Sequence, residues 1–313
     1  MFISAAHSAL RLTIPYLLIA LGGVFCFKAN IFNLALEGFA LFACLAAVAG
    51  TYFSQSVVIG IFIAMVATAI YSLLFAVFML EFKVDPIVCS LAFNLLSAGI
   101  TRYLLTPLFN TSGRFVLDSS LGLAPISLPL LKDIPGLGKI VSDQTALAYI
   151  AVLLVFVVHC FLYKTKIGFH LRVVGLNEKA SESTGVNSKR TKYLAMALCG
   201  TFCGLAGSQM ALSLNMFNVN MTDGKGWTAV IILMMTNSRP VMVLLASMLF
   251  GIADATMVKL NGYGISSQIL AMLPYILAFI FTVLPLAIKK GKIVLNKKHA
   301  AKAMNLVSTG KNR

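Results

Sequence analysis

Two carboxylates stand inside long apolar runs of the sequence, Glu37 in one and Asp254 in another. An ionised side chain at the centre of a bilayer costs at least ~2.5–3.5 kcal/mol, even on the lenient insertion scale. We therefore expect Glu37 to face the protein interior, a watery cavity or an interface. Asn33 lies four residues before Glu37, which places the two on one face if the chain is helical there. The pair predicts either a structural hydrogen bond between helices or a part in a solute pathway.

A second polar set runs along the apolar stretch 87–105. Ser90, Asn94 and Ser97 are spaced by four and three residues, so a helix would present them as one stripe. In lipid such a stripe normally turns toward other helices and forms hydrogen bonds with them. It could also line a translocation path. The candidates for a substrate pathway are Asn33, Glu37, Ser90, Asn94 and Asp254.

Hydrolytic and redox chemistry find no support in the sequence. The nearest approach to a phosphate-binding loop, Gly136 to Lys139, lacks the spacing and the hydroxyl that such a loop needs. No HExxH or G-x-S-x-G motif occurs, the four histidines are scattered, and the six cysteines lie in apolar runs without a metal or disulfide pattern. We expect neither an enzyme nor a bound cofactor. Uphill transport would then draw on an ion gradient or on a separate ATPase subunit.

The composition determines the class of protein. Of 313 residues, 59% are hydrophobic and only 11% are charged, whereas about 25% of the residues in a soluble domain are charged. Several apolar runs match the thickness of a bilayer, so the fold class is all-α, a polytopic transmembrane helical bundle of about 8–10 membrane segments, one or two of them short or broken. The expected full spans are 12–27, 31–52, 57–80, 87–105, 145–163, 193–214, 241–258 and 269–288, and 227–236 is too short to cross alone.

Basic residues gather in two places. The segment 164–192 carries seven of them against two glutamates, and the tail 289–313 carries eight more. Short basic flanks mark the cytoplasmic side of a membrane, whereas the balanced charges of 106–143 suit the outer side. The net charge of +15 thus reflects topology rather than a nucleic-acid partner, and the tail either touches anionic membrane lipid or is solvated. We treat 1–313 as one transmembrane domain, in which the side of the N-terminus stays open.

Small residues mark one span as a packing partner for other helices. Gly200, Gly204 and Ser208 are spaced four apart in the span 193–214, with Gly207 on a neighbouring strip. Small residues at this spacing let helix backbones approach closely. We therefore expect Gly200, Gly204 and Gly207 to lie at helix–helix contacts.

Several stretches, taken together, resemble the ABC-transporter permeases for simple sugars and nucleosides, a family of the ribose and branched-chain amino acid type. The resemblance covers most of the chain and rests on a set of short motifs and on the short segment 227–236. The motifs are N-I-G-I/L-E-G at 33–38, G-x-x-x-R-A-x-G-x-N at 168–177, E-A-A-x-x-x-G at 179–185, G-L-A-G at 204–207 and F-G-x-x-D at 250–254.

The resemblance implies that 164–192 contacts an ATPase subunit. The family's coupling glutamate falls on Lys179 here, with Glu178 one place earlier, and its second alanine falls on Ser181. The residues that the resemblance assigns to ATPase coupling are Arg172, Gly175, Glu178, Ala180 and Gly185.

The resemblance also implies a function. The chain would be the permease subunit of an ABC importer in a bacterial inner (cytoplasmic) membrane and would form the pathway for a nucleoside or simple sugar. Its partners would be an extracytoplasmic substrate-binding protein, an ABC ATPase subunit that binds the ATP, and a second, longer permease or a second copy of this chain. The alternatives are a permease of the same type for riboflavin or another vitamin, an ion-coupled secondary transporter that uses Glu37 and Asp254, and a membrane scaffold.

Overall fold

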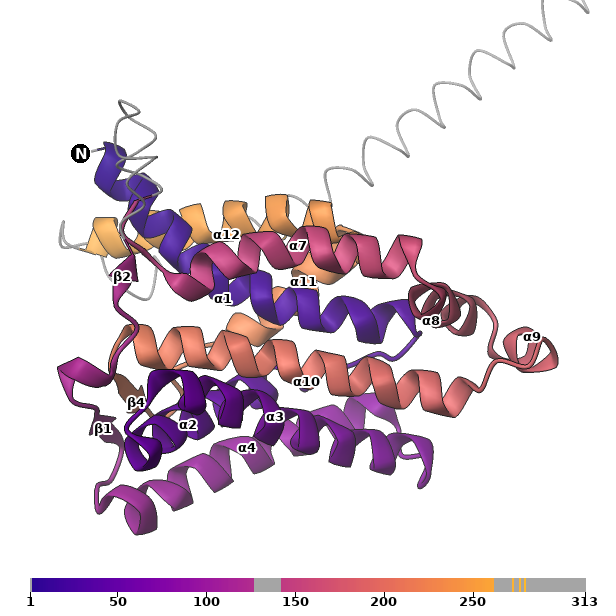
Figure 1. Cartoon of the computed structure of the whole chain (residues 1–313), viewed down its shortest axis with the longest axis horizontal. Helices are drawn as coiled ribbons and strands as arrows, with labels where there is room; N and C mark the ends of the chain where they lie inside the picture. Colours follow the sequence, from indigo (N-terminus) through magenta and orange to yellow (C-terminus); the bar gives the residue numbers. More distant parts are fainter. Residues whose placement is uncertain (1, 127–141, 262–271, 273–275, 277–278, 280–313) are drawn as a thin grey trace, which may run out of the picture. The chain divides into compact units, whose positions relative to one another are not determined.

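A computed structural model of the chain describes residues 2–126 and 142–261 and the single positions 272, 276 and 279 (Figure 1). Within these residues, seven helices are long and apolar enough to cross a membrane. Their 19 to 27 residues span roughly 28–40 Å, which covers a hydrocarbon core of ~30 Å. They are α1 Phe2–Lys28, α2 Leu36–Ser54, α3 Val57–Leu80, α4 Pro86–Phe109, α7 Ala146–Lys164, α10 Ser188–Ser213 and α12 Pro240–Asn261.

These helices confirm the all-α membrane bundle and, apart from residues 31–35, the full spans expected before residue 262. The short segment expected at 227–236 is a helix, α11 Lys225–Met235, of 11 residues. At about 1.5 Å per residue it is roughly 16 Å long, about half the thickness of the hydrocarbon core. The expected last span 269–288 and the basic tail 289–313 lie outside the continuously described residues.

Helix α10 packs against α1, α2 and α3 within the compact unit Met1–Lys259. Its glycines lie where these helices come closest. A Cβ at Gly200 or at Gly204 would stand 2.6 Å from a backbone atom of α3, and a Cβ at Gly207 would overlap Ala43 of α2. Larger side chains at these positions would push the helices apart.

The chain is not helical between α1 and α2, in residues 29–35. Asn33 accounts for the break, because its Oδ1 accepts a hydrogen bond from the Ala35 N–H at 2.8 Å, a local turn that competes with helix. Helix α2 begins only at Leu36. The prediction that Asn33 and Glu37 share one face of a single helix is therefore wrong, because Asn33 lies outside the helix.

Short elements close the two ends of the bundle (Figure 1). They are β1 Arg114–Val116, the 3-10 helix η1 Ser119–Leu121, β2 Pro125–Ile126, β3 Gln144–Thr145 and β4 Met216–Asn218 at one end, and α8 Lys166–Leu176 and α9 Glu178–Ser183 at the other. Strands β1 and β4 form one antiparallel pair, and β2 and β3 form a second. The Gln144 amide donates to the His7 carbonyl at 3.2 Å, so α1 starts at the strand-bearing end. The start of α1 and the pair α8–α9 thus lie at opposite ends.

Candidate functional site

The Glu37 carboxylate binds the N-terminus of the short helix α11. Its Oε1 accepts a hydrogen bond from the Gly224 N–H at 3.0 Å, and its Oε2 accepts one from the Gly226 N–H at 2.6 Å. The first N–H groups of a helix have no partner inside the helix, and the helix dipole favours a negative charge there. The contact is so close that a Cβ at Gly226 would overlap the Glu37 backbone. Glu37 thus fastens α2 to the start of α11.

Ser90 and Asn94 on α4 hold the non-helical backbone that precedes α2. Ser90 Oγ accepts a hydrogen bond from the Leu34 N–H at 3.1 Å, and Asn94 Nδ2 donates to the Leu34 carbonyl at 3.0 Å. Asn94 Oδ1 also accepts from the Gly38 N–H at 2.8 Å. Non-helical backbone is tolerated at membrane depth only where protein or water satisfies its polar groups. Ser90 and Asn94 supply those partners, so this side of α4 faces protein.

The variant Asn94→Leu is expected to lower the free energy of unfolding by about 1–3 kcal/mol, because it leaves the Gly38 N–H and the Leu34 carbonyl without their side-chain partner. The measurement is SDS-induced unfolding of the purified protein, followed by circular dichroism. Leu95→Ala is the control, since this neighbouring side chain is 75% exposed. Equal stability of the two variants would contradict the bracing role of Asn94.

Asn33 is fully buried at the break between α1 and α2. Besides its bond to Ala35, its amide nitrogen lies 3.9 Å from Cys26 Sγ and 3.8 Å from Cys199 Sγ. Sulfur is a weak hydrogen-bond acceptor. The amide therefore joins the break to α1 and α10 through weak contacts inside the protein.

Asp254 on α12 is buried against α1 and α11. Tyr16 Oη donates a hydrogen bond to Asp254 Oδ2 at 2.6 Å, and Lys225 Nζ lies 3.9 Å from the same oxygen. The Lys225 ammonium also lies 5.6 Å from the centre of the Tyr16 ring. The carboxylate thus has a hydrogen-bond donor and a cation beside it, as a charge inside a membrane bundle requires.

Tyr16 and Lys225 are site residues that the sequence reasoning missed. Lys225 stands one residue before Gly226, at the start of an apolar half-length segment. This position is the sequence signal that could have identified it as a site residue. Tyr16 gives no local signal, because Asp254 is 238 residues away in the chain. The first turn of α11 therefore meets Glu37 from α2 and, through Lys225, Asp254 from α12.

The five pathway candidates lie in two groups around the broken elements. Asn33 lies within the break at residues 29–35, and Ser90 and Asn94 bond to the backbone of that break, whereas Glu37 and Asp254 meet the first turn of α11. These groups hold backbone and charge in place. Among the described residues, no group of three or more His, Cys, Asp or Glu is placed to hold a metal ion.

Helix α8 packs its last turn onto the end of α1. A Cβ at Gly175 would overlap the Lys28 carbonyl oxygen, so glycine is needed for this approach. Lys28 Nζ donates to the Asn237 carbonyl at 2.8 Å, just beyond the C-terminus of α11. The Arg172 guanidinium lies 5.0 Å from the centre of the Tyr163 ring and packs α8 against α7.

Helix α9 is held to the start of α10 by side chains. Lys192 Nζ donates to Glu178 Oε1 at 2.6 Å, and the hydroxyls of Ser181 and Ser188 lie 3.2 Å apart. Glu178, which stands one position before the family's coupling glutamate, is therefore engaged within this chain. The serine that replaces the family's second alanine adds a hydrogen bond between α9 and α10.

The rest of the α9 segment is open to a partner. Ala180 is exposed within the described structure. Gly185, with φ of +85°, follows the end of α9 in the left-handed region that favours glycine, and a Cβ there would meet open space. Nearby, Lys189 donates to Glu81 in the α3–α4 turn at 2.9 Å, and this bond holds the pKa of the Glu81 carboxyl below its ordinary value.

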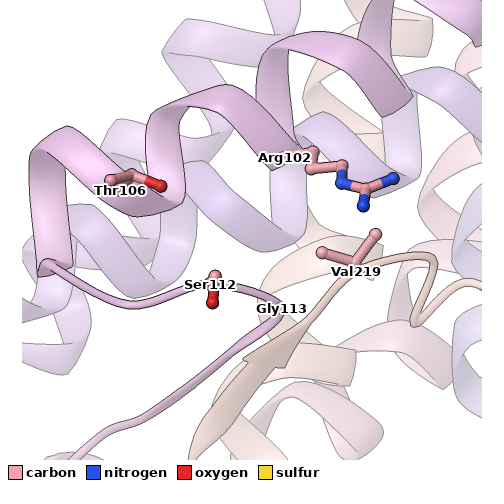
Figure 2. A pocket seen from close by; sticks show the side chains of 5 residues that line it. All are labelled: Arg102, Thr106, Ser112, Gly113 and Val219. Atoms are coloured by element: carbon pink, nitrogen blue, oxygen red, sulfur yellow. The ribbon is translucent and has the colours of Figure 1, made fainter.

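A pocket of about 420 Å³ opens at the strand-bearing end of the bundle (Figure 2). Two of the residues that line the pocket lie on helix α4, and the other three lie in the segments beside β1 and β4. The lining residues are Arg102, Thr106, Ser112, Gly113 and Val219. The five pathway candidates do not line it, and the sequence reasoning did not single it out.

Comparison with known proteins identifies relatives of most of the chain. The family model for the branched-chain amino acid transport system / permease component matches residues 5–285. NupC of Lactococcus lactis, a nucleoside ABC transporter permease protein, is 28% identical over 295 residues, which cover 90% of this chain and 91% of NupC. NupQ of Bacillus subtilis, a guanosine ABC transporter permease protein, is 29% identical over 249 residues, or 77% of each chain. A glucose ABC transporter permease protein of Haloferax volcanii is 29% identical over 271 residues, covering 80% of this chain and 70% of its own.

The family match and the seven apolar helices of the described structure agree with each other. Permeases of this family are not themselves enzymes, and membership implies an ATPase and a substrate-binding protein as partners. The chain belongs to the family of branched-chain amino acid transport system / permease components, and it is the permease subunit of an ABC importer and a multi-pass protein of the inner (cytoplasmic) membrane.

Proposed function

We propose that this permease carries a nucleoside or a simple sugar into the cell. The relatives described above are permeases for nucleosides, guanosine and glucose. These solutes share a ring with vicinal hydroxyl groups. Riboflavin, which none of these three names includes, is not proposed.

The partners follow from the two ends of the bundle. The segment 164–192, with α8 and α9, contacts a cytoplasmic ATPase subunit that binds the ATP, and this chain hydrolyses none itself. The strand-bearing end meets the substrate-binding protein outside. The chain resembles two nucleoside permease proteins of one organism, NupC and NupB of Lactococcus lactis, which supports pairing with a second, different permease.

One set of contacts carries the proposal for how ATP drives transport. Gly175 of α8 touches Lys28, and Lys28 bonds to Asn237 beyond the end of α11. At the other end of α11, Glu37 of α2 bonds to Gly224. A shift of α8 at the ATPase therefore reaches the C-terminal end of the short helix through packed groups and a hydrogen bond, and a shift of α11 reaches α2 through Glu37. Movement of α11 and of the break before α2 would then open and close the passage.

The variant Gly175→Ala is expected to lower ATP-dependent uptake by about tenfold while ATP hydrolysis continues, since coupling free energies are typically ~1–3 kcal/mol. The added Cβ would overlap the Lys28 carbonyl oxygen and separate α8 from α1. Uptake and ATP hydrolysis are measured in the same proteoliposomes. The matched control is Gly99→Ala on α4, where the Cβ would meet open space. Unchanged uptake per ATP in Gly175→Ala would contradict the proposed path.

The function itself is tested with the complex of both permeases, the ATPase and the binding protein in proteoliposomes. Labelled guanosine and labelled glucose are supplied outside, with ATP inside or absent. We expect uptake of one of them only with ATP. Uptake driven by an ion gradient without the ATPase would instead show a secondary transporter and overturn the proposal.

A further inference from the structure

Arg102 is a charged, exposed residue within a helix that otherwise suits a membrane. It stands seven residues before the end of α4 at Phe109, which is about 10 Å along the helix. Within the described residues, the structure records no hydrogen bond or ion pair of the Arg102 guanidinium. A charged side chain at this depth normally faces water or a functional cavity rather than lipid. Here it faces the 420 Å³ pocket (Figure 2).

The wall opposite α4 is held by backbone hydrogen bonds. The Val219 N–H donates to the Gly113 carbonyl at 3.0 Å, and next to this bond Arg114 pairs with Asn218 in the β1–β4 ladder. Gly113 has a φ of +91°, and a Cβ there would meet open space, so a ligand can approach its backbone. The pocket therefore has one wall on α4 and one on a braced pair of strands.

The lining groups define the kind of ligand. A guanidinium offers five N–H donors in a planar fork, and the hydroxyls of Thr106 and Ser112 can each donate and accept. Val219 adds an apolar surface. The volume of about 420 Å³ lies in the range of small-molecule sites, ~300–1,000 Å³. A neutral solute with neighbouring hydroxyls can use the fork and both hydroxyls together. An anion would be expected to meet a second cation, and among the lining residues Arg102 is the one cation.

We propose that this pocket, the Arg102 pocket, binds the vicinal hydroxyl groups of a ribosyl or hexosyl solute at the outer end of the passage. Arg102 donates hydrogen bonds to two adjacent hydroxyl oxygens of the solute. The hydroxyl oxygens of Thr106 and Ser112 accept hydrogen bonds from these solute hydroxyls, and the sugar ring packs on Val219. The pocket is thus a specificity site on the permease, reached after the binding protein releases the solute. This inference rests on the proposed import of a nucleoside or sugar.

The test compares guanosine with 2′,3′-dideoxyguanosine in proteoliposomes that contain the complete complex. In every arm the binding protein is the same, so a change in the uptake ratio of the two solutes must come from the permease. Arg102→Gln and Thr106→Val are expected to lower kcat/KM for guanosine by about tenfold each, the loss of roughly one good hydrogen bond. Both variants are expected to leave kcat/KM for the dideoxy analogue unchanged. The control is Lys83→Gln, an exposed lysine in the turn before α4, at the end of that helix away from the pocket.

Two results would overturn the proposal. Equal loss for both solutes, together with weaker binding of the substrate-binding protein to Arg102→Gln, would show that Arg102 binds an acidic side chain of that protein. An unchanged ratio in both variants would show that the pocket does not read hydroxyl groups. A wild-type complex without uptake of guanosine or glucose would refute the proposed function instead. In that case, saturation-transfer NMR with methyl β-D-ribofuranoside still tests the pocket, since the signal must be lost in Arg102→Gln.

Discussion

The Glu37→Ala variant is expected to lower the free energy of unfolding of the purified permease by about 2–3 kcal/mol. It leaves the N–H groups of Gly224 and Gly226 without their acceptor at the start of α11. A hydrogen bond to a charged group contributes about 1.5–3 kcal/mol in soluble proteins, whereas bonds between membrane helices average about 0.6 kcal/mol. We expect the free energy that the two charge-assisted hydrogen bonds contribute at this helix terminus to lie between these limits. SDS-induced unfolding, followed by circular dichroism, measures the change.

Two further variants separate the causes. Glu37→Gln keeps the side-chain length and one acceptor oxygen but loses the charge, so it is expected to recover about half of the stability lost in Glu37→Ala. Glu81→Gln is the matched control, because Glu81 is an exposed glutamate bonded to Lys189 and Tyr193 on the surface. We expect it to change stability by less than about 0.5 kcal/mol. Wild-type stability in Glu37→Ala would show that α11 is held without this carboxylate.

Transport by the same variants distinguishes the two roles that the sequence left open for Glu37. If Glu37 only holds α11 in place, its removal displaces α11, and the uptake of every solute falls by the same factor. A group that contacts the solute instead changes the ratio between solutes, because catalytic and transport selectivity follow differential contacts. The hydrogen bonds to the α11 backbone favour the first role. We therefore expect Glu37→Gln to reduce uptake of guanosine and of an analogue equally.

The membrane helices could be predicted because hydropathy is a property of each local stretch. The boundaries also follow from local chemistry where it is strong. Asp85 accepts hydrogen bonds from the N–H groups of Ile87 and Val88, and Pro86 occupies the first helical position of α4. Such signals lie within a few residues of the helix they define, so the sequence contains them directly.

The break at residues 29–35 could not be predicted in the same way. A helix with Asn33 and Glu37 four residues apart satisfies the local pattern equally well. The backbone instead takes its partners from Ser90 and Asn94, which lie 56 and 60 residues from Leu34 in the chain. Their role as helix-to-helix donors and acceptors was one of the expected alternatives, but the identity of the partner groups depends on tertiary packing. The pairing of Tyr16 with Asp254 was missed for the same reason.

A double-mutant cycle on Asp254 and Lys225 is expected to give an interaction energy of about 1–2 kcal/mol. Asp254→Asn leaves the Lys225 ammonium, whose side chain is 17% exposed, without the carboxylate that lies 3.9 Å away. Removing one partner of a buried pair leaves an uncompensated charge and is worse than removing both. The double variant Asp254→Asn with Lys225→Met should therefore be more stable than the sum of the single effects predicts. Stability is again measured by SDS-induced unfolding.

The matched control is the same cycle on Glu81 and Lys189. This pair is closer, at 2.9 Å, but its side chains are 44% and 61% exposed, so we expect a coupling of about 0.2–1 kcal/mol. If distance decided the coupling, the exposed pair would be the stronger one, and our account of Asp254 would be wrong.

Tyr16→Phe gives a further check, because asparagine at 254 can still accept a hydrogen bond from the Tyr16 hydroxyl whereas alanine cannot. The effect of Tyr16→Phe should thus persist in Asp254→Asn and vanish in Asp254→Ala, which would show that the buried carboxyl oxygen, besides its charge, ties α12 to α1.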